Sequence, residues 1–235
     1  MSRRPDDQEF EQIEHTRIRR AIGERTLKSV NEIPQFRVQK QAIADGLVEF
    51  RSRLKEAGGD IIPTYNDIII KLVAAVLPDH PRLNAWCADE GLKLLENINV
   101  GFAVDTDDGV MLPTVFNADE KPLEEIARDT ADMIDKARRG RLRASLQMGA
   151  GFTISNIGPI GIDVFDAIIS PPQTAILALG SIMEKPVAIK GRVVTANTVW
   201  LSLTMDHKSV DGADGARFLA DLAEHFENPE AVLGD

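Results

Sequence analysis

Residues 199–212 read VWLSLTMDHKSVDG, an apolar stretch that runs into a histidine flanked by acidic residues. The first seven residues, Val199 to Met205, have the composition and length of a buried strand. Asp211 stands directly before Gly212 and is a residue type that caps a helix. Apolar residues then recur at helical spacing as far as Phe226. The stretch therefore predicts a buried strand that delivers His207 to a sharp junction with a final helix over about 211–226.

The rest of the chain predicts a mixed α/β architecture. Helices are expected over about 16–29, 44–56, 64–77 and 122–139, where apolar residues recur every three or four positions. Strands are expected over 35–39, 152–156 and 175–179, and a β-rich stretch over 92–115 turns at Asp107-Asp108-Gly109. No Gly-rich phosphate loop follows any of these strands, which argues against a dinucleotide or ATP enzyme.

Composition argues against a nucleic-acid-binding, membrane or secreted protein. The 235 residues are 43% hydrophobic and 27% charged, with a formal net charge of -10 and no long basic run. We therefore expect a globular domain without a nucleic-acid partner, since phosphate binding needs concentrated Lys and Arg. A single cysteine, Cys87, suits a reducing cytoplasm. No membrane span or secretory signal is expected. Residues 1–15 read as a polar, flexible leader before a domain at 16–235.

Histidines are the first candidates for chemistry. His15, His80 and His225 read as surface or capping residues, and the four histidines lack companions at metal-ligand spacing, so no metal site is expected. His207 differs because an apolar strand places it at a junction. It is either a strand-end histidine or a general base, and a base needs a second group that holds its ring. Asp211 reads as an N-cap that also fixes the loop.

The stretch Asp206–Ala213 resembles the signature of the dihydrolipoamide acyltransferases, the core components of 2-oxo acid dehydrogenase complexes. Chloramphenicol acetyltransferase shares their fold and a shorter version of this signature, His-x-x-x-Asp-Gly. Further segments resemble the family in the same order along the chain, from about residue 16 to 233: Asn97–Val104, Asn117–Asp119, Gly151–Gly158 and Ala167–Leu177. The resemblance implies a chloramphenicol acetyltransferase-like fold, with a mixed sheet and flanking helices.

The resemblance also implies roles for individual residues. His207 would take the proton from the thiol of coenzyme A or dihydrolipoamide, and the Ser155 hydroxyl would donate to the carbonyl oxygen on which negative charge develops. Without the resemblance, Ser155 reads as a strand-end hydroxyl bonded to backbone. Asn156 and Gly212 are supporting residues in the two signatures.

Asp211 would orient the loop through an ion pair with Arg20 or Arg19 of the first helix. The sequence does not choose between these arginines, and both also read as a solvated helix face. Lys208 stands where the family usually has Arg, which keeps the charge but loses the bidentate fork.

The implied partners are those of a multienzyme complex. Coenzyme A would be a substrate, and the lipoyl group would come in trans or from a domain absent from this chain, which shows neither a lipoyl nor a subunit-binding domain. We expect a homotrimer with active sites between subunits, the histidine from one chain and the serine from its neighbour. The acidic last residue favours a trimer that does not assemble further. Two other functions stay open: a free-standing coenzyme A acyltransferase with another acceptor, and a scaffold with vestigial activity.

Overall fold

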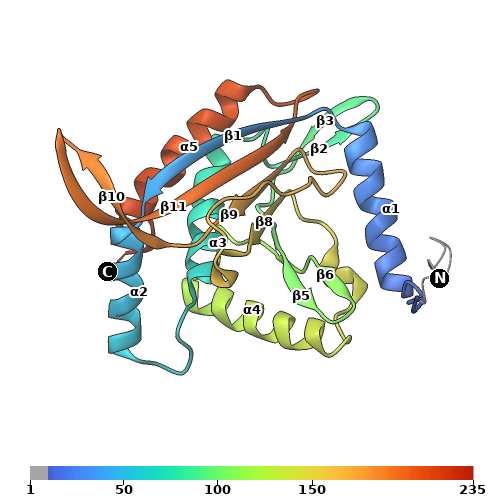
Figure 1. Ribbon diagram of the computed structural model, residues 1–235, viewed down its shortest axis with the longest axis horizontal. Helices are drawn as coiled ribbons and strands as arrows, with labels where there is room; N and C mark the ends of the chain where they lie inside the picture. The colour runs from blue at the N-terminus through green and yellow to red at the C-terminus, as the bar shows by residue number, and fades with distance from the viewer. Residues whose placement is uncertain (1–9, 235) are drawn as a thin grey trace, which may run out of the picture.

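A seven-stranded mixed sheet forms the centre of the computed structural model, which describes residues 10–234 (Figure 1). The strands follow the order β1-β11-β9-β8-β4-β7, and β10 pairs with β11 outside this path. β8 runs parallel to its neighbours β4 and β9, whereas the other pairs are antiparallel. The strands are β1 Gln35–Ile43, β4 Val100–Phe102, β7 Thr114–Val115, β8 Phe152–Asn156, β9 Ala175–Leu179, β10 Met183–Ile189 and β11 Arg192–Asp206.

Helices cover one face of this sheet, where α2, α3, α4 and α5 pack against one another, while α1 stands apart at the other end of the molecule (Figure 1). Two small hairpins, β2–β3 and β5–β6, lie outside the main sheet. The helices are α1 Arg17–Glu32, α2 Asp45–Ala57, α3 Tyr65–Val76, α4 Leu123–Arg138, α5 Gly212–Glu227 and α6 Glu230–Leu233. The hairpin strands are β2 Ala85–Ala88, β3 Gly91–Leu94, β5 Val104–Thr106 and β6 Gly109–Met111.

The two faces of the sheet differ in chemistry. Leu201, Leu203 and Met205 of β11 are fully buried in the main core beneath the helices. Alternate residues of a strand point to opposite faces, so Ser202, Thr204 and Asp206 lie on the other face. Ala178 is in register with Ser202, and Ser155 with Ala178, which places Ser155 on this second face.

The second face is covered by the segment that follows β8. Ala167 and Ile169 of this segment pack against Ile176 and Ala178 of β9 in a small apolar cluster. Beside that cluster, the carboxylate of Asp166 accepts hydrogen bonds from side chains of β1 and β11. Ser155 therefore stands at the margin of a mixed polar and apolar layer rather than in the main core.

Side chains cap the starts of two predicted helices. Thr16 caps α1 by accepting from the backbone N–H of Arg19 (3.1 Å). Thr64 and Asp67 form a capping box at the start of α3, so the buried apolar helix has its first N–H groups satisfied. Residues 10–15 precede α1 without regular structure and are exposed, whereas residues 1–9 of the predicted leader lie outside the described residues.

The predicted elements are present, but β11 is longer than expected and β10 was missed. Residues 192–198 pair with β10 as a hairpin that projects from the sheet (Figure 1). Val193 in this hairpin is 79% exposed. Residues 192–195 are all exposed, so this part of the strand carries no burial pattern, and apolar periodicity detects only the part of β11 inside the sheet.

Candidate functional site

The backbone and an aromatic ring hold His207 at the end of β11. Its N–H donates to the carbonyl of Pro34 (3.0 Å), and its imidazole packs on the ring of Phe36 with centroids 4.9 Å apart. Gly212 leaves space for that ring, since a Cβ at Gly212 would lie 2.8 Å from Phe36 Cε1. The His207 side chain remains 45% exposed. The imidazole is therefore supported on one side and accessible to a substrate on the other.

Asp211 is the N-cap of α5, as predicted, and it also faces the histidine. Its Oδ1 lies 3.8 Å from Nδ1 of His207, beyond hydrogen-bond distance. Its own backbone N–H donates to the side chain of Asp214 (3.2 Å). Because the Asp211 side chain is 83% exposed, its position depends on this cap rather than on packing.

The predicted ion pair between Asp211 and Arg20 or Arg19 does not form within a single chain. Among residues 10–234, neither arginine forms an ion pair with Asp211. The end of α1 that meets the histidine loop is Glu32, whose carbonyl accepts from Lys208 Nζ (3.4 Å). Arg20 lies twelve residues earlier, which is about 18 Å along a helix axis. Sequence order alone could not show which end of α1 reaches the loop.

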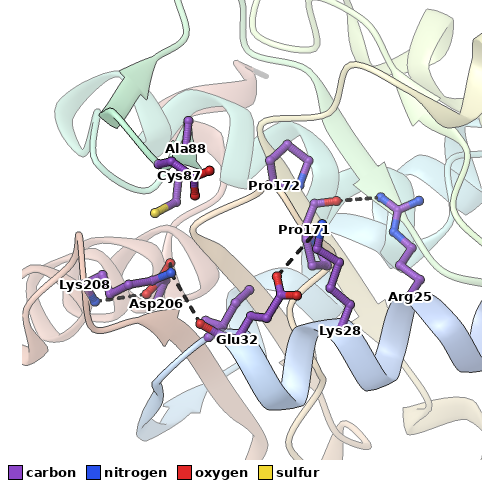
Figure 2. Close-up of a pocket in the computed structure, with 11 residues that line it drawn as sticks. Arg25, Lys28, Glu32, Cys87, Ala88, Pro171, Pro172, Asp206 and Lys208 are labelled. Atoms are coloured by element: carbon purple, nitrogen blue, oxygen red, sulfur yellow. Dashed lines mark hydrogen bonds and ion pairs between the residues drawn. The ribbon is translucent and has the colours of Figure 1, made fainter.

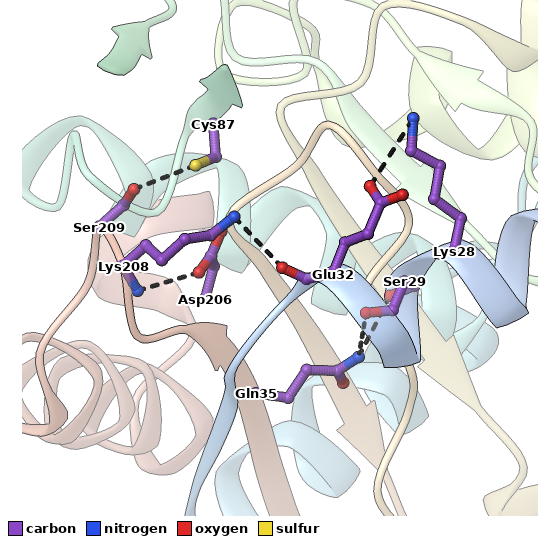
Figure 3. A network of polar contacts seen from close by, with 8 residues as sticks. All are labelled: Lys28, Ser29, Glu32, Gln35, Cys87, Asp206, Lys208 and Ser209. Carbon is purple, nitrogen blue, oxygen red and sulfur yellow. Dashed lines mark hydrogen bonds and ion pairs between the residues drawn. The ribbon is translucent and has the colours of Figure 1, made fainter. Parts of the chain in front are cut away.

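A buried carboxylate that we did not predict shapes the histidine loop. Asp206 is fully buried, and its Oδ1 accepts from the backbone N–H of Lys208 (2.9 Å). Its Oδ2 has no hydrogen bond and lies 3.9 Å from Lys208 Nζ. The backbone carbonyl of Asp206 accepts from Ser209 and Val210 (both 3.0 Å), which closes the turn after His207. Figure 3 shows Asp206 beneath Lys208. The sequence signal that could have identified Asp206 is an acidic residue at the end of an apolar strand, directly before the histidine.

A pocket of about 300 Å³ lies beside this loop, between the end of α1, the β2–β3 hairpin and Pro171-Pro172 (Figure 2). Arg25, also missed by the sequence analysis, lines it and donates to the Pro171 carbonyl (3.0 Å). Burial lowers the pKa of the Arg25 guanidinium. Cys87 is half-buried here, and its Sγ accepts from the Ser209 hydroxyl (3.4 Å).

Ser155 and Asn156 end β8 at a tight turn. Asn156 Oδ1 accepts from the backbone N–H of Gly158 (2.8 Å), and its Nδ2 donates to Asn66 Oδ1 on α3 (2.7 Å). Ser155 is half-buried. Within residues 10–234, no protein group is hydrogen-bonded to its hydroxyl. The hydroxyl is therefore able to donate to a bound molecule. The alternative interpretation, in which Ser155 is a strand-end hydroxyl bonded to backbone, is not supported.

One chain does not bring Ser155 to His207. Ser155 is level with Ser202 across β9, and His207 lies five residues further along β11. At the usual strand dimensions, this is about 16 Å along the strands and about 10 Å across them, or roughly 19 Å in all. A base and an oxyanion donor must both reach the same reacting group within hydrogen-bond distance. The two halves of the predicted site are separate in the isolated chain.

The remaining histidines do not add to the site. His80, predicted as a surface or capping residue, is mostly buried, with its side chain 10% exposed. Its Nε2 lies 2.8 Å from Asp221 Oδ2, and its ring meets Phe218 edge-on. Over residues 10–234, no three His, Cys, Asp or Glu residues gather as a metal site would require, and no helix there is long and apolar enough to cross a membrane.

The sequence matches one family model over nearly its whole length: 2-oxoacid dehydrogenases acyltransferase (catalytic domain), over residues 7–234. The dihydrolipoyllysine-residue acetyltransferase component of the pyruvate dehydrogenase complex from Rickettsia bellii is 33% identical to it, over 99% of this chain and 56% of that protein. The chain thus spans little more than half the length of this curated relative.

Solved structures give the same result. A structure of Azotobacter vinelandii dihydrolipoamide acetyltransferase, in which the catalytic roles of a serine, a histidine and an asparagine were investigated, has a TM-score of 0.91 and 31% identity, covering 97% of this chain and 96% of that one. The cubic core of a pyruvate dehydrogenase multienzyme complex agrees equally well. Chloramphenicol acetyltransferase, at 15% identity and a TM-score of 0.53, shares the fold alone and covers 86% of this chain. The predicted fold class is confirmed.

Proposed function

This chain belongs to the 2-oxoacid dehydrogenases acyltransferase (catalytic domain) family, and we propose that it transfers acyl groups between the thiols of dihydrolipoamide and coenzyme A. The observation that carries the proposal is the placement of two groups. His207 is an accessible imidazole supported by Phe36, and Ser155 is a half-buried hydroxyl free to donate. Such a pair suits a reaction in which one proton leaves a thiol and one carbonyl oxygen gains charge.

In the proposed reaction His207 acts as the general base. A free thiol has a pKa near 8.5, so a positioned base increases the fraction that attacks as thiolate near neutral pH. The thiolate adds to the acyl thioester carbonyl, and the Ser155 hydroxyl donates to the oxygen that becomes negative. Collapse of this intermediate expels the second thiolate, which takes the proton back from His207. No residue of the chain becomes acylated.

Chain positions support these roles. The serine, histidine and asparagine investigated in the Azotobacter enzyme are separated along its chain by the same numbers of residues as Ser155, His207 and Asp211 here. An aspartate thus stands where that enzyme has an asparagine. Both side chains carry an oxygen that can face the imidazole, so the substitution leaves the proposed mechanism intact.

We propose that the working unit is a homotrimer in which His207 of one chain meets Ser155 of its neighbour. The separation of roughly 19 Å within a chain supports this proposal, because no single chain can complete the site. Cyclic symmetry would generate identical sites at every interface. Light scattering should give a mass of at least three times 25.8 kDa. A monomer with full activity would contradict the shared site.

The proposed partners follow from the substrates. Coenzyme A enters as a diffusible thiol, and the dihydrolipoyl group arrives on a lipoyl domain, either from another chain or from a part of the protein outside this sequence. The other enzymes of a 2-oxo acid dehydrogenase complex would supply and reoxidise that group. Because the relatives reported above are acetyltransferases, we propose acetyl as the first acyl group to test.

The test is direct transfer. The protein is mixed with acetyl-CoA and free dihydrolipoamide, and the S-acetyl product is followed with His207→Ala and Ser155→Ala variants beside the wild type. We expect His207→Ala to lose nearly all transfer and Ser155→Ala to lose about 10²–10³ in rate. Absence of transfer by the wild type with any of acetyl-, succinyl- or branched-chain acyl-CoA would refute the proposed activity. It would leave the alternatives of another acceptor or a scaffold.

A further inference from the structure

We infer that Asn66 is a positioning residue for the Ser155 hydroxyl and acts through the side chain of Asn156. The inference rests on the proposed function, since it gives Asn66 a part in that same site. The observation is one hydrogen bond, 2.7 Å long, from Asn156 Nδ2 to Asn66 Oδ1. It connects the first turn of α3 to the end of the strand that carries Ser155, and the two residues are far apart in sequence.

The direction of this hydrogen bond follows from a neighbouring contact. The backbone N–H of Gly158 can only donate, and it lies 2.8 Å from the Asn156 side-chain oxygen. Asn156 therefore presents its NH₂ group to α3, and Asn66 must present its oxygen. The pair has one defined orientation in which both Asn156 side-chain atoms are used.

The turn that Asn156 holds is itself tightly packed. A Cβ at Gly158 would lie 2.3 Å from the Gly180 carbonyl oxygen, so only glycine fits this approach. Ser181 donates from its hydroxyl to the Gly158 carbonyl (2.7 Å). The turn after Ser155 is thus fixed to the strand end of β9 on one side, and Asn66 fixes it to α3 on the other.

These contacts matter because Ser155 has no side-chain bond of its own. Nothing in residues 10–234 is hydrogen-bonded to its hydroxyl, so the hydroxyl is oriented by the backbone of a strand end and the turn that follows. An oxyanion donor is useful only if it lies within about 0.5 Å of its required position. The hydrogen bond to Asn66 restricts movement of that strand end relative to α3.

The experiment replaces the amide groups of Asn66 and Asn156 with carboxylates, singly and together, in the intact assembly. Asn66→Asp keeps an acceptor opposite Asn156. Asn156→Asp keeps the acceptor for Gly158 N–H, and Asn66 can then turn its amide to donate. The double variant Asn66→Asp/Asn156→Asp places two carboxylates face to face with no donor between them. Asn66→Leu, of similar size, removes the hydrogen bond without adding charge.

We expect each single Asp variant to lower kcat for acetyl transfer less than about fivefold, and the double variant to lower it at least about 30-fold with little change in KM for acetyl-CoA. Asn66→Leu should lower kcat about tenfold or more. In a Ser155→Ala background the same changes should have no further effect, because Asn66 acts only through that hydroxyl. Thermal unfolding of each variant separates loss of fold from loss of position.

The failure of this inference differs from failure of the proposed function. If the wild type transfers no acyl group, the function is wrong, and the inference is then decided by a crystal structure of the double variant. Ser155 and the turn at Gly158 unmoved in that structure would overturn it. If the wild type is active, the inference is overturned when the fold-loss of kcat in the double variant does not exceed the product of the fold-losses in the two single variants. The inference is also overturned if the Asn66 and Asn156 changes lower kcat equally in the wild-type and the Ser155→Ala backgrounds.

Discussion

Adding a single methyl group at Gly212 should misplace the His207 imidazole, our proposed general base, without unfolding the protein. A Cβ there would lie 2.8 Å from Phe36 Cε1, whereas ordinary contacts begin near 3.4 Å. The ring must therefore retreat by about 0.6 Å or more, and His207 packs directly on it. Because a misplacement of about 1 Å can cost 10²-fold in rate, we expect Gly212→Ala to lower kcat about tenfold or more.

The effect on stability should be small in comparison. Gly212 is the first residue of α5 and does not adopt a left-handed backbone conformation, so alanine suits its backbone. Helix propensity favours alanine by up to about 1 kcal/mol, and the crowded ring opposes it by about 1–3 kcal/mol. We expect the free energy of unfolding to change by less than about 2 kcal/mol. Rate and stability should therefore separate in this variant.

The assay is acetyl transfer from acetyl-CoA to dihydrolipoamide, with urea unfolding of the same preparations. Gly23→Ala is the matched control, because Gly23 lies in α1 with nothing within 4 Å of an added Cβ. A Phe36→Leu background removes the ring, so Gly212→Ala should have little additional effect there. If Gly212→Ala is as fast as Gly23→Ala, or if its loss is the same with and without the Phe36 ring, the reasoning is refuted.

Four further variants, at three positions, test neighbouring contacts. Asp211→Asn should keep transfer within about threefold, since an oxygen still faces His207 and the cap remains, whereas Asp211→Leu should also destabilise α5 by about 1 kcal/mol in urea unfolding. Arg25→Met should lower the free energy of unfolding by about 0.5–1.5 kcal/mol, because the exposed Pro171 carbonyl exchanges its donor for water. Cys87→Ser should leave the transfer rate within about twofold, since an oxygen can still accept from Ser209, and a much larger loss would indicate a thiol-dependent step.

Local patterns were sufficient for most secondary structure and for the ends of helices. The apolar run that begins at Ile68 predicts a buried helix from about residue 64, and the structure adds a capping box between Thr64 and Asp67 at its start. The β10–β11 hairpin was missed for the opposite reason. Its outer part, which includes residues 192–195, is exposed and is held by strand pairing, and pairing without burial leaves no apolar periodicity in the sequence.

The sequence by itself determined that His207 follows a buried strand, that Asp211 caps the next helix, and that both belong to a family signature. These are relations between residues within one turn or strand, which local chemistry fixes. Only the tertiary structure decided what touches them: Phe36 supports the imidazole, and Asp206 shapes its loop. It also placed Ser155 far from His207 in the same chain, because strand order and register depend on the whole sheet.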